Sequence, residues 1–511
     1  RQCTTKSLYF IPFLFLLLLF SIQIPKWVPS NSLPFLNFNS SRHRSNEPPD
    51  SLLRDGFDED SCFSRYQFSS FHRHSPRVTP SYLVSKLREY ERRHVRCGPH
   101  TESYNKSVRM LSTSEANNDG CDYLIWDGLD GLGNRMLSGV SAFLFAVLTD
   151  RVFLTYHIAD MSRLFCEPFF NSSWVLPSDF PLYHKLGDLH FIRAHSFGEL
   201  LSSSANNTPQ YLSLYLQYDY GDDDKKFYLD QHQKFLQKIP WLILASDQYF
   251  APWLFTIESY RNELEKLFPN KESTFHLLGR YLFHPSNEVW GLITRFYRAY
   301  MEKHDERIGL QIRVFKPKRS PHRLVIDHLL DCVNGTEILP RVGEVVSPNR
   351  NSSSKGVLVT SLYSEYYEQL KEMYMRKDTL RGEVVGVYQP SHEMFQHFGD
   401  IDHDMKALAE IYLLSTCDVL LTTSWSTFGY IAHGLAGLKP WIFFVPLVND
   451  SSSVKQCRRA ISVEPCFHYP PYYDRVIGRI NNVSSLEPFH MHCEDADWGV
   501  KLVDIEHRQS R

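Results

Sequence analysis

The chain has 511 residues, of which 43% are hydrophobic, and it carries a formal net charge of −3 at pH 7. This length and apolar content suffice for two domains with cores of their own. The near-neutral charge excludes the basic surface that is typical of nucleic-acid-binding proteins. Aromatic residues make up 14% of the chain, and we expect most of them in the core.

A membrane anchor is predicted near the N-terminus. Residues 8–24 are almost wholly apolar. The length of this run is close to the lower limit for crossing a bilayer, roughly 17 residues. Arg1 and Lys6 precede this run, so the positive-inside rule places the N-terminus in the cytosol. A cleaved signal peptide is the alternative, but the Pro-Lys-Trp that follows offers no small-residue cleavage site. We therefore expect a type II protein, with residues 1–25 as tail and signal-anchor and residues 26–80 as stem.

Cysteines and glycosylation triplets agree with a lumenal location for the rest of the chain. Of the 10 cysteines, all but Cys3 lie downstream of the anchor. Their spacing matches no zinc or CxxC signature, so we expect disulfides of open connectivity in an oxidising lumen. An odd number leaves one thiol over, and Cys417, which opens an apolar strand, is predicted to be free and buried. Asn-x-Ser/Thr triplets begin at Asn39, Asn105, Asn171, Asn206, Asn334, Asn351, Asn449 and Asn482.

The N-terminal half shows a β-α-β pattern after an amphipathic helix that is predicted over 81–95. An apolar strand at 121–126 leads through a Gly-rich turn at 127–135 into a helix at 136–150 and a strand at 151–156. A right-handed connection makes the two strands parallel. The glycines of the turn allow a close backbone approach, although a structural turn explains them equally well. Another apolar strand, WLILAS, ends just before Asp247.

The C-terminal half repeats this alternation of strand and helix. Such a pattern predicts a doubly wound, mainly parallel sheet. Together with the first set of elements it gives two lobes, 81–304 and 305–511, that face a cleft. The predicted strands of the second lobe cover 308–314, 355–363, 384–388 and 418–423.

Two strand ends in this second sheet predict a site for a nucleotide diphosphate. Arg313 lies at the carboxyl end of its strand, where ligands bind in open α/β sheets, and its guanidinium can hold two phosphate oxygens. A structural ion pair with a carboxylate is the alternative. The SWSTF segment joins another strand to a helix start, which favours phosphate binding, whereas a simple helix cap is the alternative. Its residues are Ser424, Trp425, Ser426, Thr427 and Phe428.

Several carboxylates are further candidates. Asp247 follows a buried strand and could orient or deprotonate a hydroxyl, although a helix N-cap is the commoner use of such a residue. Asp495 stands in a polar loop, where a solvated acid is the default interpretation. The acidic runs Asp222–Asp224 and 400–404 are interpreted as a solvated turn and a helix cap rather than as a metal site. The sequence predicts no required metal and no other cofactor.

Several long blocks of the chain resemble a known family. These blocks are similar to plant xyloglucan-type galactoside α-1,2-fucosyltransferases, from about Ser61 to about Asp504. They read DGLDGLGNRMLSGVSAFLFAVLTDRVFL, LGRYLFHPSNEVWGLITRFY, IGLQIRVF, TSWSTFGYIAHGLAGLKPW, EPCFHYPP and HCEDADWGVKLV.

The resemblance implies a GT-B-like fold of two Rossmann-like lobes in a type II protein of the Golgi membrane. It implies transfer of L-fucose from GDP-fucose to a galactose 2-hydroxyl, with inversion and without a metal ion. The acceptor would be a xyloglucan or an arabinogalactan protein, and a homo-oligomeric state is left open. A catalytically inactive glycan-binding protein of the same fold is the alternative. A glycoside hydrolase, which needs a pair of carboxylates, is a weaker one.

The resemblance also implies roles for individual residues. Arg313 matches the family's diphosphate-binding Arg, and residues 424–428 match its GDP-cradling segment. Asp247 and Asp495 match acids near the reacting sugars. The chain departs from the family at Gln248, His433 and the loop 391–404, which leaves the acceptor open. The turn that faces the cleft contributes Gly133, Asn134 and Arg135.

Overall fold

The computed structural model describes most of the chain from residue 52 onward. The predicted anchor at 8–24 and the triplets at Asn39, Asn206, Asn351, Asn449 and Asn482 lie outside the described residues. No helix within the described residues is long and apolar enough to cross a membrane. The described ranges are 52–72, 78–111, 120–156, 158–186, 196–202, 208–344, 353–448, 457–471, 473–474, 479–480 and 488–504.

The first sheet has four parallel strands in the order β2-β1-β4-β3. Helix α4 (Leu132–Leu148) connects β1 to β2, so the predicted β-α-β unit is confirmed. The Trp126 indole N–H donates to Ser138 Oγ at 3.2 Å and fixes this helix on its strand. Strand β3 was not predicted. The strands are β1 (Tyr123–Gly128), β2 (Val152–Thr155), β3 (Tyr211–Leu216) and β4 (Trp241–Ser246).

The second sheet has six strands in the order β10-β9-β8-β5-β6-β7, and only β10 runs antiparallel to its neighbour. The prediction of an α/β chain with two mainly parallel sheets is therefore confirmed. Strand β5 ends at Gln311, so Arg313 lies in the loop just beyond it. The strands are β5 (Glu306–Gln311), β6 (Ser354–Thr360), β7 (Val384–Tyr388), β8 (Val419–Thr423), β9 (Trp441–Phe443) and β10 (Cys457–Arg459).

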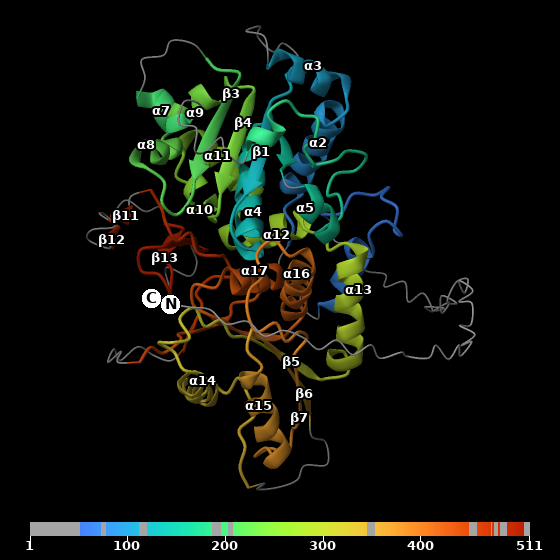
Figure 1. The fold of residues 1–511 in the computed structure, drawn as a ribbon, viewed down its shortest axis with the longest axis vertical. Helices are drawn as coiled ribbons and strands as arrows, with labels where there is room; N and C mark the ends of the chain where they lie inside the picture. The colour runs from blue at the N-terminus through green and yellow to red at the C-terminus, as the bar shows by residue number, and fades with distance from the viewer. Residues whose placement is uncertain are drawn as a thin grey trace, which may run out of the picture. The chain divides into compact units, whose positions relative to one another are not determined.

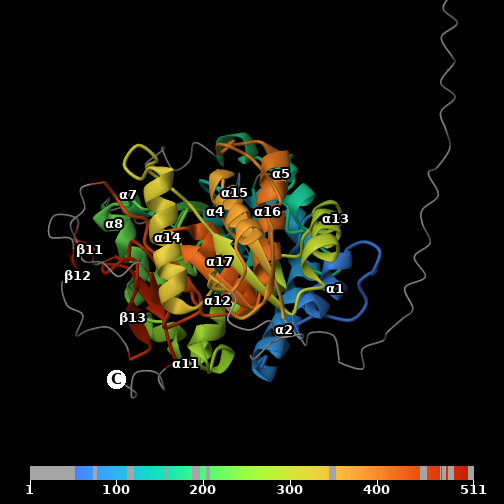
Figure 2. The ribbon, with the colours of Figure 1, turned by 90° about the horizontal axis from the view of Figure 1, so that it is seen from below.

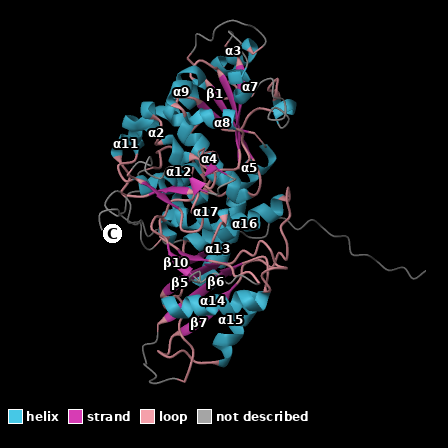
Figure 3. Cartoon of the chain, turned by 90° about the vertical axis from the view of Figure 1, so that its left-hand side faces the viewer, coloured by secondary structure: helices cyan, strands magenta, loops and turns pink. Residues whose placement is uncertain are grey.

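Helices cover both faces of the second sheet. Alternate side chains of a strand point to opposite faces, so neighbouring residues of β6 pack with different helices. Val357 and Val359 of β6 pack with α14 (His322–Thr336) and α15 (Glu365–Arg376). Leu358, between them, packs in the cluster that holds α16 (Ile401–Ser415) and α17 (Thr427–Ala436). Helices α14 and α15 lie at the lower end of Figure 1 and nearest the viewer in Figure 2. Figure 3 shows α16 and α17 on the side toward the first sheet.

The remaining elements surround the first sheet and the junction between the lobes. The predicted helix at 81–95 is confirmed as α2, and α13 is followed directly by a π-helical turn. These elements are α1 (Phe63–Phe71), α2 (Ser81–Cys97), α3 (Glu102–Met110), α5 (Ile158–Leu164), η1 (Tyr183–Lys185), α7 (Phe197–Ser202), α8 (Asp222–Lys225), η3 (Lys226–Tyr228), α9 (Asp230–Leu236), α10 (Ala251–Leu254), α11 (Glu258–Leu267), η4 (Lys271–Ser273), α12 (Thr274–Leu282), α13 (Asn287–Phe296), η5 (Tyr297–Met301), β11 (Tyr473–Asp474), β12 (Arg479–Ile480), β13 (His490–His492) and β14 (Val500–Leu502).

Each predicted lobe holds one of the two larger sheets, but the chain crosses between them. Glu464 accepts hydrogen bonds from Phe275 N at 2.8 Å and from the Tyr249 hydroxyl at 2.5 Å. His490 Nε2 lies 2.7 Å from the Pro252 carbonyl. The C-terminal segment thus packs against elements of the N-terminal half. The division at 304/305 therefore separates the sheets and not the packed cores, and the domain bounds remain a proposal.

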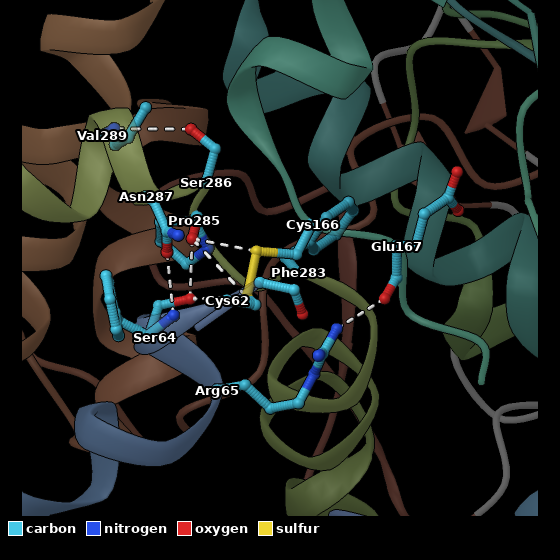
Figure 4. Close-up of a disulfide and its surroundings, with 12 residues drawn as sticks. Cys62, Ser64, Arg65, Cys166, Glu167, Phe283, Pro285, Ser286, Asn287 and Val289 are labelled. Atoms are coloured by element: carbon cyan, nitrogen blue, oxygen red, sulfur yellow. Dashed lines mark hydrogen bonds between the residues drawn. A yellow bond between two sulfur atoms is a disulfide. The ribbon is translucent and has the colours of Figure 1, made fainter. Parts of the chain in front are cut away.

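Four disulfides join the described cysteines, in the pairs Cys62–Cys166, Cys97–Cys121, Cys332–Cys457 and Cys466–Cys493. Cys417 is free and buried, as predicted. Figure 4 shows how the first pair attaches α1 to the segment that follows α5. There the Ser64 hydroxyl donates to the Pro285 carbonyl at 2.7 Å. Part of the predicted stem, from α1 onward, is therefore packed against the folded body.

We expect loss of the buried Arg307–Asp418 pair to destabilise the fold. The Arg307 side chain is fully buried, and its Nη2 and Nε donate to the two Asp418 carboxylate oxygens at 2.8 and 3.1 Å. In Asp418→Ala the guanidinium loses its counter-ion while it stays buried, which should cost about 3 kcal/mol. Urea unfolding followed by tryptophan fluorescence measures this.

Asp222→Ala is the matched control, because it removes an exposed pair with Lys225. It should change the unfolding free energy by less than about 0.5 kcal/mol. Equal stability of the two variants would contradict the structural importance of the buried pair.

Candidate active site

A cavity of about 450 Å³ lies where the strand ends of both sheets meet. The sequence analysis expected a cleft between two lobes, and the cavity lies between the two larger sheets. Its walls come from the turn after β1, the ends of β4, β5 and β6, the start of α17, the loop before α16 and the segment after Cys466. The predicted residues that line it are Gly133, Asn134, Asp247, Arg313, Trp425, Ser426, Thr427 and Phe428.

Three predicted residues are not among the residues that line the cavity. The Ser424 backbone N–H donates to the Phe443 carbonyl at 2.9 Å, which continues the pairing of β8 with β9. Arg135 instead forms an ion pair with Asp404, a residue of the cavity wall. Asp495 lies behind Trp425. Strand continuation holds Ser424, an ion pair holds Arg135, and hydrogen bonds with Trp425 hold Asp495.

Arg313 presents a half-buried cation that forms no ion pair with a described acidic residue. Its backbone N–H donates to Thr423 Oγ1 at 2.9 Å, and that hydroxyl donates to the Gln311 carbonyl at 2.9 Å, so the ends of β5 and β8 are tied together. Its Nη2 donates to Gln396 Oε1 at 2.9 Å. Burial lowers the pKa of Arg313 below its usual value. Within the described residues Arg313 forms no ion pair, so the structural alternative of a carboxylate pair is not observed.

The starts of α4 and α17 meet at the cavity. The Thr427 hydroxyl donates to Asn134 Oδ1 at 2.9 Å. A Cβ on Gly133 would lie 2.6 Å from Thr427 Oγ1 and 3.0 Å from Phe428 N, so this close approach requires glycine. Neither helix start receives a side-chain cap, although Ser426 occupies the cap position of α17. Two uncapped helix starts at one cavity favour an anionic ligand.

Asp247 provides a carboxyl group on the side of the first sheet. It follows β4 directly, is 4% exposed, and its Oδ1 accepts from Tyr218 N at 3.1 Å. Burial, with the nearby Asp130 carboxyl, raises the pKa of Asp247 to about 7. A carboxyl with this pKa can take a proton from a hydroxyl near neutral pH. The helix-cap alternative for Asp247 is wrong, because α10 begins later and has Phe250 at its cap position.

Asp495 holds Trp425 in place. Its Oδ2 accepts from Trp425 N at 2.9 Å and from the Tyr430 hydroxyl at 2.6 Å, and its carbonyl accepts from the Trp425 indole N–H. Trp425 has φ of 65°, a left-handed conformation that non-glycine residues rarely adopt. Asp495 therefore stabilises a strained residue of the cavity wall. It is neither a solvated acid nor, in this arrangement, a group in the wall itself.

The acidic runs have the structural roles that the sequence favoured. Asp222 and Asp223 pair with Lys225 and Lys226 at the surface. Asp400 caps α16 by accepting from the backbone N–H groups that follow it. The metal-type cluster found among the described residues is Cys466, Cys493 and Asp495, but its two sulfur atoms form a disulfide and are not free to bind a metal.

Sequence reasoning missed several residues of the cavity wall. Gln396 belongs to the loop 391–404, which the sequence marked only as divergent. Aromatic rings form another part of the wall: Trp425 stacks on His468 with centroids 5.2 Å apart, and Tyr218 lies 6.1 Å from Tyr469. The EPCFHYPP block contains two of these rings and could have signalled them. Such a wall suits the apolar face of a sugar.

We expect Gly133→Ala to separate the two helix starts. The added methyl group meets the Thr427 hydroxyl and the Phe428 backbone, so the wall of the cavity must move. A displacement of about 1 Å in a catalytic site reduces activity by up to about a hundredfold. Turnover and melting temperature of the purified variant test this, and both should fall.

Gly335→Ala is the control for this substitution. Gly335 lies in α14, and a Cβ there meets nothing within 4 Å. The exchange should stabilise the helix by about 0.5–1 kcal/mol and leave turnover unchanged. Wild-type turnover in Gly133→Ala would show that the close contact is not needed.

Comparison with known proteins agrees with this geometry. A model of the family described as xyloglucan fucosyltransferase matches residues 39–476. A galactoside 2-alpha-L-fucosyltransferase of Pisum sativum is 50% identical over 460 residues, which are 89% of this chain and 81% of the relative. The enzyme of the same name from Arabidopsis thaliana is 48% identical over 459 residues, 88% and 82% of the two chains.

A solved structure is also similar. A mutant of Arabidopsis thaliana FUT1 in complex with GDP superposes with a TM-score of 0.82 at 47% identity and covers 89% of this chain and 99% of its own. The family model and the relatives together show that the chain belongs to the xyloglucan fucosyltransferase family.

Proposed function

We propose that this chain transfers L-fucose from GDP-fucose to the 2-hydroxyl of a galactose residue on a plant cell-wall glycan. One observation carries the proposal. A half-buried guanidinium, which has no acidic partner in the part of the chain that the structure describes, shares one cavity with an uncapped helix start and with a carboxyl whose pKa is near neutrality. The names of the two relatives support the galactose 2-hydroxyl as acceptor, and the GDP of the related structure supports the donor.

In the proposed mechanism the donor diphosphate lies on Arg313 and on the first turn of α17. The bond between the fucose anomeric carbon and the diphosphate breaks, and negative charge grows on the departing GDP. A preorganised cation stabilises that charge more than it stabilises the bound substrate, an effect worth about 3 kcal/mol. The desolvation of Arg313 strengthens the interaction, because fewer water molecules compete for the guanidinium.

The acceptor lies on the side of the first sheet. The galactose 2-hydroxyl attacks the anomeric carbon opposite the leaving diphosphate, so the configuration inverts. Asp247 takes the hydroxyl proton. The aromatic wall of Trp425, His468, Tyr218 and Tyr469 orients the sugar and reduces access of water, which would otherwise hydrolyse the donor.

The wider setting is part of the proposal. We place the protein in the Golgi membrane as a type II protein with a lumenal catalytic part and a GT-B-like pair of lobes. Disulfides among the described cysteines support an oxidising compartment. The acceptor glycan is a xyloglucan or an arabinogalactan protein.

Arg313→Ala should reduce transfer at least about a hundredfold, because the charge on the leaving diphosphate loses its main donor. The assay is incubation of the full chain with GDP-fucose and, separately, with xyloglucan and arabinogalactan acceptors, followed by linkage analysis of the product. The melting temperature should stay near the wild-type value. Arg323→Ala, an exposed residue of α14, is the control. Transfer by Arg313→Ala at a rate close to wild type would refute the pocket assignment.

We expect EDTA to leave the transfer rate unchanged. Arg313 and the start of α17 supply the positive charge at the diphosphate, and the acidic runs are engaged in surface pairs and a helix cap. The measurement is the initial rate before and after dialysis against EDTA, with re-addition of Mn²⁺ as the control. Strong inhibition that Mn²⁺ reverses would instead make residues 400–404 a metal site.

A further inference from the structure

We propose that Asp130 is a second proton-handling residue of this reaction, which receives the acceptor proton from Asp247 and passes it to solvent. This inference rests on the proposed function and extends it by one residue. Asp130 belongs to the turn between β1 and α4, where sequence reasoning singled out only glycines and the GNR residues.

The register of the first sheet brings the two carboxylates together. Strands β1 and β4 are parallel neighbours with Gly128 opposite Ser246. Leu129 N donates to the Ser246 carbonyl at 3.2 Å, so the turn after β1 is fastened to the end of β4. Asp130 and Asp247 follow these two strand ends, and both line the cavity. Asp247 is buried and Asp130 is exposed, so the pair leads from the interior of the cavity to water.

No described basic side chain is close enough to pair with either carboxylate, although Arg313 and Lys406 line other parts of the cavity. Within the described residues neither Asp130 nor Asp247 forms an ion pair with Lys, Arg or His. The groups that face Asp247 are Tyr215 from β3, the N–H of Tyr218, Gln248 and Asn134. Two neighbouring carboxylates without a cation favour a shared proton. The Asp130 carboxyl accordingly contributes, after burial, to the raised pKa of Asp247.

The backbone at Asp130 is strained. Its φ is 63°, in the left-handed region where glycine has the lowest conformational energy. Aspartate tolerates this region better than most residues. A carboxylate is therefore held at a position that local geometry alone would give to glycine, and such strain is found preferentially at functional sites.

The proposed step balances without a further reactant. The acceptor oxygen forms its bond to the fucose anomeric carbon, and the bond from that carbon to the diphosphate breaks, with the electron pair leaving on GDP. The acceptor proton moves to the Asp247 carboxylate. Asp247 then donates it to the Asp130 carboxylate, and Asp130 releases it to water. Both carboxylates are thereby restored for the next turnover.

The pH dependence of kcat in the full chain tests this relay. In the wild type we expect kcat to rise with pH through an acid limb near the pKa of Asp247. Asp130→Asn keeps the shape and the left-handed backbone but removes the charge and the proton acceptor. The limb should move to lower pH by about one unit, while the KM for GDP-fucose stays unchanged because Arg313 holds the donor. Asp222→Asn, an exposed acid away from the cavity, should leave the limb in place.

A second measurement does not depend on activity. Protonated Asp247 favours the folded state, so its raised pKa makes the melting temperature fall as pH rises from the usual carboxyl range to about 7. This fall should be smaller in Asp130→Asn and absent in Asp247→Asn. In the double variant, Asp130→Asn should have no further effect on the slope.

The outcomes separate the two proposals. The relay alone is overturned if the wild type is active and Asp130→Asn keeps both the acid limb of kcat and the pH dependence of the melting temperature. If the Asp130→Asn variant has no measurable activity, the pH dependence of its melting temperature decides whether the relay holds. A wild type that transfers no fucose to any galactose-bearing acceptor overturns the proposed function and the relay with it.

Discussion

The contact between the starts of α4 and α17 is the constraint on which the site depends. One hydrogen bond, from Thr427 to Asn134, and one missing side chain, at Gly133, let two helices from different sheets meet at their N-termini. The same Asn134 donates to the backbone carbonyl of Asp247 at 3.3 Å. A short chain of contacts therefore links the start of α17, beside the second sheet, to Asp247 at the end of β4 in the first sheet.

Arg313 and Asp247, the two groups of the proposed mechanism, owe their pKa shifts to the same physical cause. Burial disfavours the charged form of any group, so it lowers the pKa of Arg313 and raises the pKa of Asp247. For the arginine the remaining charge is less screened by water and acts more strongly on an anion. For the aspartate the shift brings the carboxyl into the range where it can accept and release a proton. In the proposed mechanism, one partly dry cavity thus prepares both the leaving-group side and the acceptor side.

Local patterns were sufficient for most elements of the fold. The apolar runs and their helical neighbours identified β1, α4, β4, β5, β6, β7, β8 and α17, because each has a strong period of its own. Strand β3 was missed, although its alternating pattern lies beside β4. Arg313 was placed on a strand, whereas it lies just beyond the last strand residue. Strand ends are decided by a few hydrogen bonds that the periodicity does not contain.

Contacts between distant segments were harder to foresee. Asp495 stood out only by resemblance, and its position behind Trp425 depends on a backbone conformation that nothing in the local sequence announces. Gln396 lies in a loop without periodicity, yet it accepts the hydrogen bond of Arg313. The pairing of the cysteines was likewise open, because connectivity depends on which segments pack together.

The sequence by itself determined the alternation of strands and helices, the free buried Cys417 and the two strand ends that carry Arg313 and the SWSTF segment. These features follow from hydrophobic period and local backbone chemistry, which neighbouring residues specify. Only the tertiary structure decided which groups share the cavity, that Asp247 is buried beside Asp130, and that Asp495 positions Trp425 instead of lining the wall. Those relations depend on sheet register and on helix packing across hundreds of residues, and burial, which sets the pKa values, exists only after the chain has packed.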